Sequence, residues 1–77
     1  MNGNFPIGSR VKIQTKYSGM YNGKIGTVIE DPAKVAFNYD DSWIRVRFDT
    51  PAIFGENQIS DDIFRDNELT LFKEYEQ

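Results

Sequence analysis

Aromatic side chains interleaved with glycines mark the first stretch of this sequence that suits binding chemistry. Tyr17, Met20 and Tyr21 lie in a glycine-rich segment that ends at Lys24. Exposed tyrosine and methionine are typical of contact sites that adapt to a partner. The same residues also have a structural explanation, because Tyr17 or Tyr21 can fold back and cover a small core. Both explanations stay open at this point, and the binding hypothesis includes all four side chains.

A second candidate surface lies on the segment from Trp43 to Asp49. Trp43, Arg45 and Arg47 alternate with apolar residues, which places the three side chains on one side of a strand. An aromatic platform flanked by arginines suits a nucleic-acid backbone with stacked bases, and it equally suits the carboxylates of an acidic protein surface. The alternative is a solvated face whose arginines pair with acids nearby in the sequence, namely Asp40, Asp41 or Asp49.

The charge is divided unevenly along the chain. Residues 1–29 carry four basic residues and no acid, whereas residues 30–77 carry five basic and twelve acidic residues, which gives a net charge of −3. This asymmetry predicts one basic face and one acidic face. Arg10, Lys12 and Lys16 would form the basic face of a nucleic-acid binder, but a sequence pI of about 4.7 argues against a dedicated one.

Catalytic and metal chemistry are not expected. The sequence contains no histidine and no cysteine, so it lacks the commonest general base, the commonest zinc ligand and any thiolate nucleophile. Acids near the C-terminus lack EF-hand spacing and favour a solubilising role at the start of a short helix; they are Asp61, Asp62, Asp66 and Glu68. The sequence therefore predicts no enzyme, no cofactor, no metal site and no small-molecule substrate.

The length of 77 residues predicts a single domain that spans residues 1–77, with flexible ends at 1–6 and 74–77. No apolar run approaches the ~20 residues that a membrane helix needs. The N-terminal residues also lack the charged and apolar regions of a signal peptide. These features predict a cytoplasmic protein that has no contact with a membrane.

Alternating apolar residues and regularly spaced turn residues predict an all-β fold. Five strands are expected, at about 10–15, 25–30, 43–49, 56–59 and 68–73. A single helical turn capped by Ser60 is expected at 60–67, and residues 35–39 read as strand, short helix or loop. Asn22-Gly23 predicts a tight turn, and Phe5 is expected to cover one end of the core. The inward-facing residues are expected to be Val11, Ile13, Ile44, Val46, Phe48 and Leu69. Leu71 is expected either to face inward as well or to share an edge position with Phe72.

Residues 10–30 combine alternating β-branched residues with spaced glycines. The pattern consists of Val11, Ile13, Gly19, Gly23, Lys24, Gly26, Thr27 and Val28. It resembles the KOW motif of ribosomal proteins and transcription elongation factors, and residues 43–49 and 68–72 resemble, more weakly, the third and last strands of such domains. The resemblance implies a five-stranded SH3-like small barrel that serves for recognition. The chain departs from KOW modules bound to ribosomal RNA, which are typically basic and lie within longer proteins.

The sequence as a whole predicts a non-catalytic interaction module that binds another protein. The residues expected to carry binding are Tyr17, Met20, Tyr21, Lys24, Trp43, Arg45 and Arg47. The chain is expected to be a monomer or a weak dimer, because edge strands can pair. Its small size and acidic charge also suit a regulator or inhibitor encoded by a phage or a mobile element. The alternative is a KOW-like nucleic-acid-binding module that uses Arg10, Lys12 and Lys16.

Overall fold

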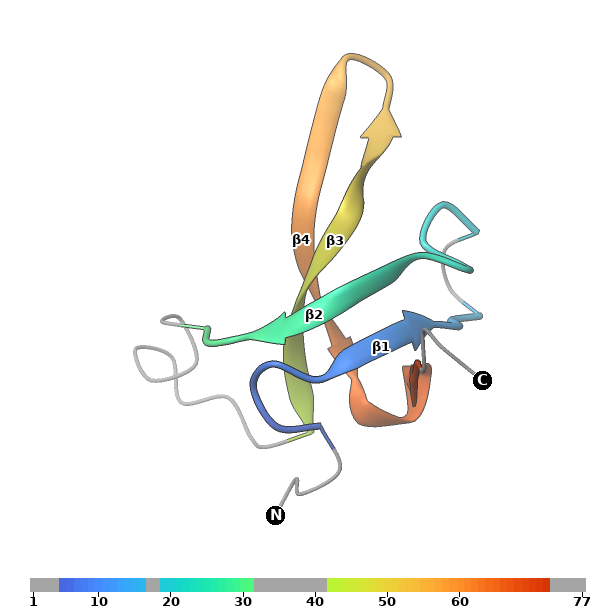
Figure 1. The fold of residues 1–77 in the computed structure, drawn as a ribbon. Coiled ribbons are helices and arrows are strands. Elements are labelled where there is room, and N and C mark those ends of the chain that lie inside the picture. Colours follow the sequence, from blue (N-terminus) through green and yellow to red (C-terminus); the bar gives the residue numbers. More distant parts are fainter. Residues whose placement is uncertain (1–4, 17–18, 32–41, 73–77) are drawn as a thin grey trace, which may run out of the picture.

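Alternation of apolar and polar side chains persists along the chain and produces five strands that pair antiparallel in one sheet (Figure 1). The computed structural model describes residues 5–16, 19–31 and 42–72. Its elements are β1 (Arg10–Ile13), β2 (Ile25–Ile29), β3 (Trp43–Phe54), β4 (Asn57–Arg65), the 3-10 turn η1 (Asp66–Glu68) and β5 (Leu69–Leu71). The expected all-β fold, with five strands and one short helical turn before the last, is confirmed. Residues 35–39 lie outside the described residues, as do 1–4 and 74–77 of the ends expected to be flexible.

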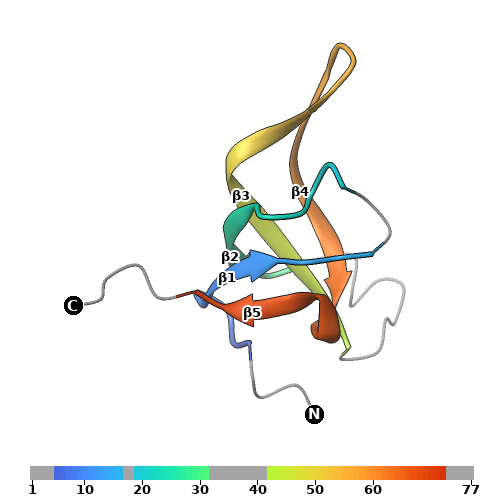
Figure 2. The same ribbon diagram turned by 90° about the vertical axis from the view of Figure 1, so that its right-hand side faces the viewer.

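The sheet is open at both sides. Its strand order is β4-β3-β2-β1-β5, so β4 and β5 form the two edges. Although β5 follows β4 in the chain through η1, it pairs with β1 at the opposite side of the sheet (Figure 2). The strands expected of a small barrel are therefore present, but the sheet that they form in the described residues is not closed into a barrel.

One face of the sheet is apolar and forms the core. Val11, Ile13 and Val46 have no exposed surface, which confirms the predicted direction of these side chains. Phe5 packs against the core, as expected. Leu71 is 54% exposed at the end of a three-residue edge strand, so of its two expected positions the inward-facing one is wrong. The other buried apolar residues are Tyr21, Val28, Ile44, Phe48, Ala52, Phe64 and Leu69.

β3 is longer than the sequence predicted. The strand was expected to end at Asp49, but it continues to Phe54. The ladder with β4 shifts register between Arg47 and Ala52, so Pro51 falls in an irregular stretch where a missing N–H is tolerated. Gly55, with a φ of 64°, lies in the turn that leads from β3 into β4. A strand at 56–59 is thus only the beginning of β4.

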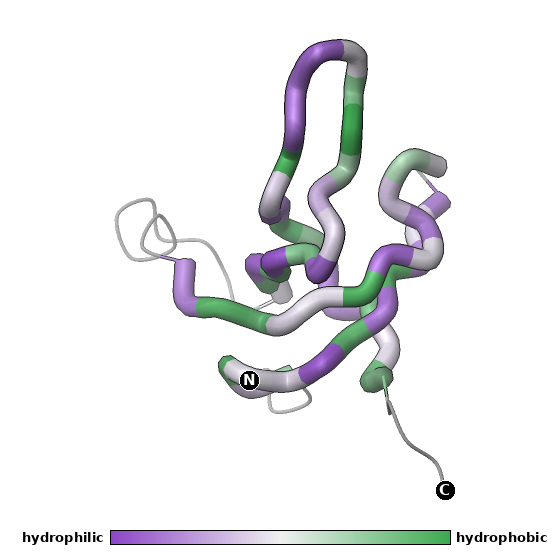
Figure 3. Tube along the Cα trace, turned by 45° about the horizontal axis from the view of Figure 1, so that its top comes forward, coloured by the Kyte–Doolittle hydropathy of each residue, from purple (hydrophilic) through white to green (hydrophobic). Residues whose placement is uncertain are grey.

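The ends of β3 and β4 form a two-stranded extension, which we call the hairpin arm (residues 52–59). β2 accompanies β3 only as far as Phe48, so the hairpin arm has no third strand beside it in the described part of the chain. It projects beyond the other strands in both ribbon views (Figures 1 and 2). Near its tip the β3 side is hydrophobic and the β4 side is hydrophilic (Figure 3).

The helical turn is shorter and later than predicted. Residues 60–65, expected to be helical, belong to β4, and the turn is confined to Asp66–Glu68. Pairing with β3 explains the difference, because it buries Phe64 opposite Ile44. Long-range pairing thus overrides the local signal from a potential cap at Ser60.

Two strands approach each other very closely at Gly26. A Cβ atom at this position would lie 2.2 Å from the backbone oxygen of Arg47 and 2.7 Å from Cγ1 of Val46. Both distances are far below any van der Waals contact, so only glycine fits here. This close approach joins β2 to the centre of β3, the strand that carries the candidate surface.

Candidate interaction surface

The polar face of the sheet carries the aromatic and cationic residues singled out in the sequence. Trp43, Arg45 and Arg47 alternate along β3 with the buried residues of the core, so the three side chains lie on the face opposite the core. In the ladder with β4, Trp43 pairs with Arg65 and Arg47 pairs with Asp61. The three residues of β3 have different environments, which separates their roles.

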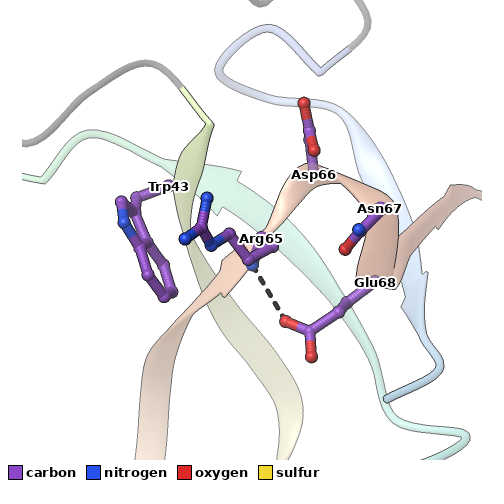
Figure 4. A pocket seen from close by; sticks show the side chains of 5 residues that line it. All are labelled: Trp43, Arg65, Asp66, Asn67 and Glu68. Atoms are coloured by element: carbon purple, nitrogen blue, oxygen red, sulfur yellow. Dashed lines mark hydrogen bonds between the residues drawn. The ribbon is translucent and has the colours of Figure 1, made fainter. Parts of the chain in front are cut away.

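Trp43 is held by a residue that the sequence did not single out. The guanidinium of Arg65 lies over the indole at 4.5 Å from the ring centroid, and its Nη1 donates a hydrogen bond of 3.1 Å to Ser42 Oγ. This is the geometry of a cation–π contact. The two side chains border a pocket of about 320 Å³, shown in Figure 4, that is lined by Trp43, Arg65, Asp66, Asn67 and Glu68.

Glu68 has a structural role at the floor of this pocket. Its Oε1 accepts a hydrogen bond of 2.9 Å from the backbone N–H of Arg65, drawn in Figure 4, and its Oε2 accepts one of 2.5 Å from the buried hydroxyl of Thr15. The carboxylate therefore joins the 3-10 turn to the end of β1. Asp66 and Asn67 are exposed and leave the rim of the pocket polar.

Arg45 belongs to an ion-pair cluster. Its Nη1 lies 2.7 Å from Asp61 and its Nε lies 3.1 Å from Asp31, whose side chain is only 7% exposed. Burial favours the neutral guanidinium, but the adjacent carboxylates of Asp31 and Asp61 outweigh it and raise the pKa of Arg45. The proposed binding residue is thus engaged within the protein. Of the acids expected to pair with these arginines, Asp49 instead pairs with Arg10, and Asp40 and Asp41 lie outside the described residues.

Arg47 is the exposed arginine of β3. It makes no ion pair in the ranges that the structure describes, although Asp61 lies opposite it in the ladder. An exposed arginine retains its full set of five donors for a carboxylate or a phosphate. Arg47 lies on the same face of the sheet as Trp43 and Arg65, beyond the row that holds Arg45.

The basic face proposed for nucleic acid is partly neutralised. Arg10 forms a bidentate pair with Asp49 through hydrogen bonds of 2.7 and 2.6 Å, and Nη1 also donates to Thr27 at 2.9 Å. The hydrogen bonds from Arg10 lower the pKa of Asp49. Lys12 and Lys16 are exposed. Of the three predicted cations, Arg10 is thus engaged in an ion pair, whereas Lys12 and Lys16 face solvent.

The aromatic loop closes the core. Tyr21 is 9% exposed, and its ring lies 5.3 Å from that of Phe48 and 5.4 Å from that of Phe64. Its hydroxyl donates a hydrogen bond of 2.6 Å to Asp62, which lies opposite Val46 on the core side of the sheet. Burial, then the hydrogen bond and the charge of Asp62, raise the pKa of Tyr21 to about 12. Tyr21 therefore folds back and covers the core, which is the structural explanation given for it from the sequence.

The rest of the loop supports the sheet. The predicted turn at Asn22-Gly23 is present, with a φ of 85° at Gly23 and a hydrogen bond of 3.1 Å from the N–H of Lys24 to the carbonyl of Tyr21. Met20 is half-buried against the core. Lys24 donates to the backbone carbonyls of two residues in the irregular stretch of β3 (residues 50 and 51) at 3.0 and 3.4 Å. Tyr17 lies outside the described residues.

Sequence reasoning missed three exposed residues of interest. Arg65 was assigned to a helical turn, so its place opposite Trp43 was not visible. Ile53 and Phe54 fall outside the strands expected at 43–49 and 56–59, but they lie at the tip of the hairpin arm, where they are 60% and 63% exposed. An Ile-Phe pair directly before a glycine was the available signal for this hairpin tip.

Comparisons of the chain with protein-family models, with curated proteins and with solved structures found no match. Within residues 5–16, 19–31 and 42–72, no group of three or more acidic, histidine or cysteine side chains is arranged to hold a metal ion. The same ranges contain no helix of the length and apolarity needed to cross a membrane. The candidate surface consequently rests on geometry alone.

Proposed function

We propose that this protein is a non-catalytic interaction module that binds another protein through a surface composed of Trp43, Arg65 and Arg47. The observation that carries the proposal is the stacking of Arg65 on Trp43 beside a pocket on the polar face of the sheet. Tryptophan and arginine dominate the binding energy of protein interfaces more than other residue types do. In the unbound protein, strand pairing already holds Trp43 and Arg65 opposite each other.

This fixed arrangement favours affinity. A partner does not need to order Trp43 and Arg65, because the cation–π contact and the hydrogen bond to Ser42 already restrict them. Restriction in the free state reduces the entropy lost on binding. Arg47 and Arg65 together favour an acidic segment on the partner, since each can bind a carboxylate.

The strand order supports an SH3-like relationship as part of the proposal. β5, β1, β2, β3 and β4 follow one another across the sheet, which is the arrangement of a meander whose last strand returns beside the first. The KOW-like positions fall on β1, β2 and the loop between them. The small size and the net charge of −3 suit a regulator or inhibitor of the kind that phages and mobile elements encode.

Two exposed sets of cations allow a direct test against nucleic acid. Binding of the purified protein to single- and double-stranded DNA and RNA is measured at low and at physiological salt, together with capture of proteins from a cell lysate. The proposal expects Trp43→Ala and Arg65→Ala to abolish capture of the partner, and Lys12→Ala to preserve it. Tight nucleic-acid binding that falls steeply with salt and is lost in Lys12→Ala would overturn the proposal, because phosphate contacts have this signature.

A further inference from the structure

The hairpin arm is built to hold its tip away from the rest of the protein. Ala52 pairs with Ile59, Ile53 with Gln58 and Phe54 with Asn57, and a two-residue loop closes the ladder. Gly55 occupies the first position of this loop with a φ of 64°, a conformation that primed hairpin turns require and that glycine adopts readily. The turn is therefore tight, and the residues before it project furthest from the sheet (Figures 1 and 2).

The root of the hairpin arm is anchored to the core. Ala52 is 1% exposed, and Ile59 packs against the core from the other strand. Lys24 Nζ holds the carbonyls of Thr50 and Pro51 just before the root. The direction of the arm is thus fixed by apolar contact and by a cation, which makes the tip a preorganised projection.

Two large apolar side chains occupy the tip although they contribute nothing to the core. Ile53 is 60% exposed and Phe54 is 63% exposed. Because successive side chains of a strand point to opposite faces, Ile53 and Phe54 cover both faces of the ribbon. A flat partner surface would bury only one of them, whereas a pocket that encloses the tip would bury both.

The charge around the tip indicates the chemistry of that pocket. Residues 49–61 contain three acids and no base. Asp49 and Asp61 are paired with Arg10 and Arg45, which leaves Glu56, in the loop itself, as the exposed charge at the tip. Nucleic-acid phosphates would be repelled here, since the arm supplies no cation to neutralise them. A pocket rimmed by lysine or arginine would attract Glu56.

We propose that the hairpin arm inserts Ile53 and Phe54 into an apolar pocket of the partner protein that is rimmed by basic residues. This would be a second contact, in addition to the surface at Trp43. This inference rests on the proposed function, because it assumes a protein partner. The tip supplies apolar burial, and Glu56 sets the orientation at the rim. The two contacts lie on different parts of β3 and can be removed one at a time.

The first experiment maps what the tip touches. The photocrosslinker p-benzoylphenylalanine is introduced at position 54 of the full chain in the native cells, and at position 7 as a control, since Ile7 is 68% exposed and lies outside the arm. The expected result is an adduct from position 54 alone, on one protein, within a peptide of apolar residues flanked by lysine or arginine. Adducts to a second copy, to lipid or to nucleic acid, or none above the position 7 control, would overturn the inference.

The second experiment measures the affinity of the purified crosslinked protein by calorimetry. Phe54→Ala is expected to weaken binding about thirtyfold, as a central interface residue does, and Glu56→Lys to slow association. Ile7→Ala is the matched control and should bind like the unaltered protein. If Trp43→Ala weakens binding while Phe54→Ala does not, the inference fails and the proposed function stands. If Phe54→Ala alone weakens binding, the arm is a contact and the surface at Trp43 is not.

The thermal midpoint of each variant separates binding from folding. Phe54, Glu56 and Ile7 are all exposed, so their substitution should leave the midpoint unchanged. A midpoint that falls in Phe54→Ala would show that the residue supports the arm itself. In that case Glu56→Lys, which alters only charge, decides whether the tip contacts a basic rim.

Discussion

The hydroxyl of Tyr21 donates a hydrogen bond of 2.6 Å to the carboxylate of Asp62 across a sequence separation of 41 residues. This contact joins the glycine-rich loop to the edge strand β4, beneath the face that carries the candidate surface. Asp62 lies on the core side of the sheet, opposite Val46, and the phenol of Tyr21 provides its carboxylate with a hydrogen-bond donor there. Tyr21 is consequently part of the folded core, and its hydroxyl is engaged within the protein.

The first prediction concerns alkaline pH. The pKa of Tyr21 is raised to about 12, mainly by burial, so the folded state retains a proton that the unfolded state releases near pH 10. Stability from this group is complete below pH 10 and is lost as the pH rises toward 12. Ultraviolet titration of the phenols should show one of the four tyrosines ionising late. In Tyr21→Phe the late phase should disappear, and a single transition near pH 10 in the unaltered protein would contradict the assignment.

The second prediction concerns the close approach of β2 and β3. Gly26→Ala places a methyl group 2.2 Å from the backbone oxygen of Arg47, and backbone cannot move aside as a side chain can. We expect a loss of at least about 2 kcal/mol in the free energy of unfolding, measured by urea denaturation. Gly19→Ala is the matched control, because no atom lies within 4 Å of its added Cβ. Equal stability of the two variants would show that the strands are further apart.

The third prediction contrasts the two arginine ion pairs. Arg45→Gln weakens the pairing of Asp31, whose side chain is 7% exposed, and should cost roughly 1–3 kcal/mol in the free energy of unfolding. Arg10→Gln removes a pair whose side chains are 31% and 47% exposed, and should cost less than about 1 kcal/mol. Added salt should shrink the second effect more than the first. A larger loss of stability in Arg10→Gln than in Arg45→Gln would contradict the difference in burial between the two ion pairs.

The fourth prediction concerns the contact between Arg65 and Trp43. Arg65→Gln removes the cation from the indole and should lower the free energy of unfolding by about 0.5–1 kcal/mol. Trp43 is the single tryptophan of the chain, so its fluorescence emission reports this contact without interference. The emission should shift in Arg65→Gln and remain unchanged in Arg47→Gln. An identical spectrum in both variants would show that Arg65 does not lie over the ring.

The core could be predicted from the sequence because strand faces are a local property. Alternation alone identified Val11, Ile13, Ile44, Val46 and Phe48 as inward-facing, and each is buried. The length of β3 was not visible in the same way. Proline and glycine in 50–55 read locally as breakers, whereas pairing with β4 places the proline in an irregular stretch and the glycine in a tight turn.

The candidate surface could be predicted only in part, because its chemistry depends on register between strands. Alternation placed Trp43, Arg45 and Arg47 on one face. Which of them is engaged follows from residues remote in the sequence, namely Asp31 and Asp61 beside Arg45, and Arg65 over Trp43. No local pattern distinguishes an arginine in an ion-pair cluster from one that faces solvent. The register of β4 supplies that distinction.

An unclosed sheet offers its outermost strand as a template on which further chains can assemble, and β4 is nine residues long. A new strand alongside β4 would place a further side chain next to Asp62 on the core face and would reduce the contact of its carboxylate with water. That cost opposes fibril-like growth from this margin. The residue that anchors the loop therefore also makes the addition of a further strand at β4 less favourable.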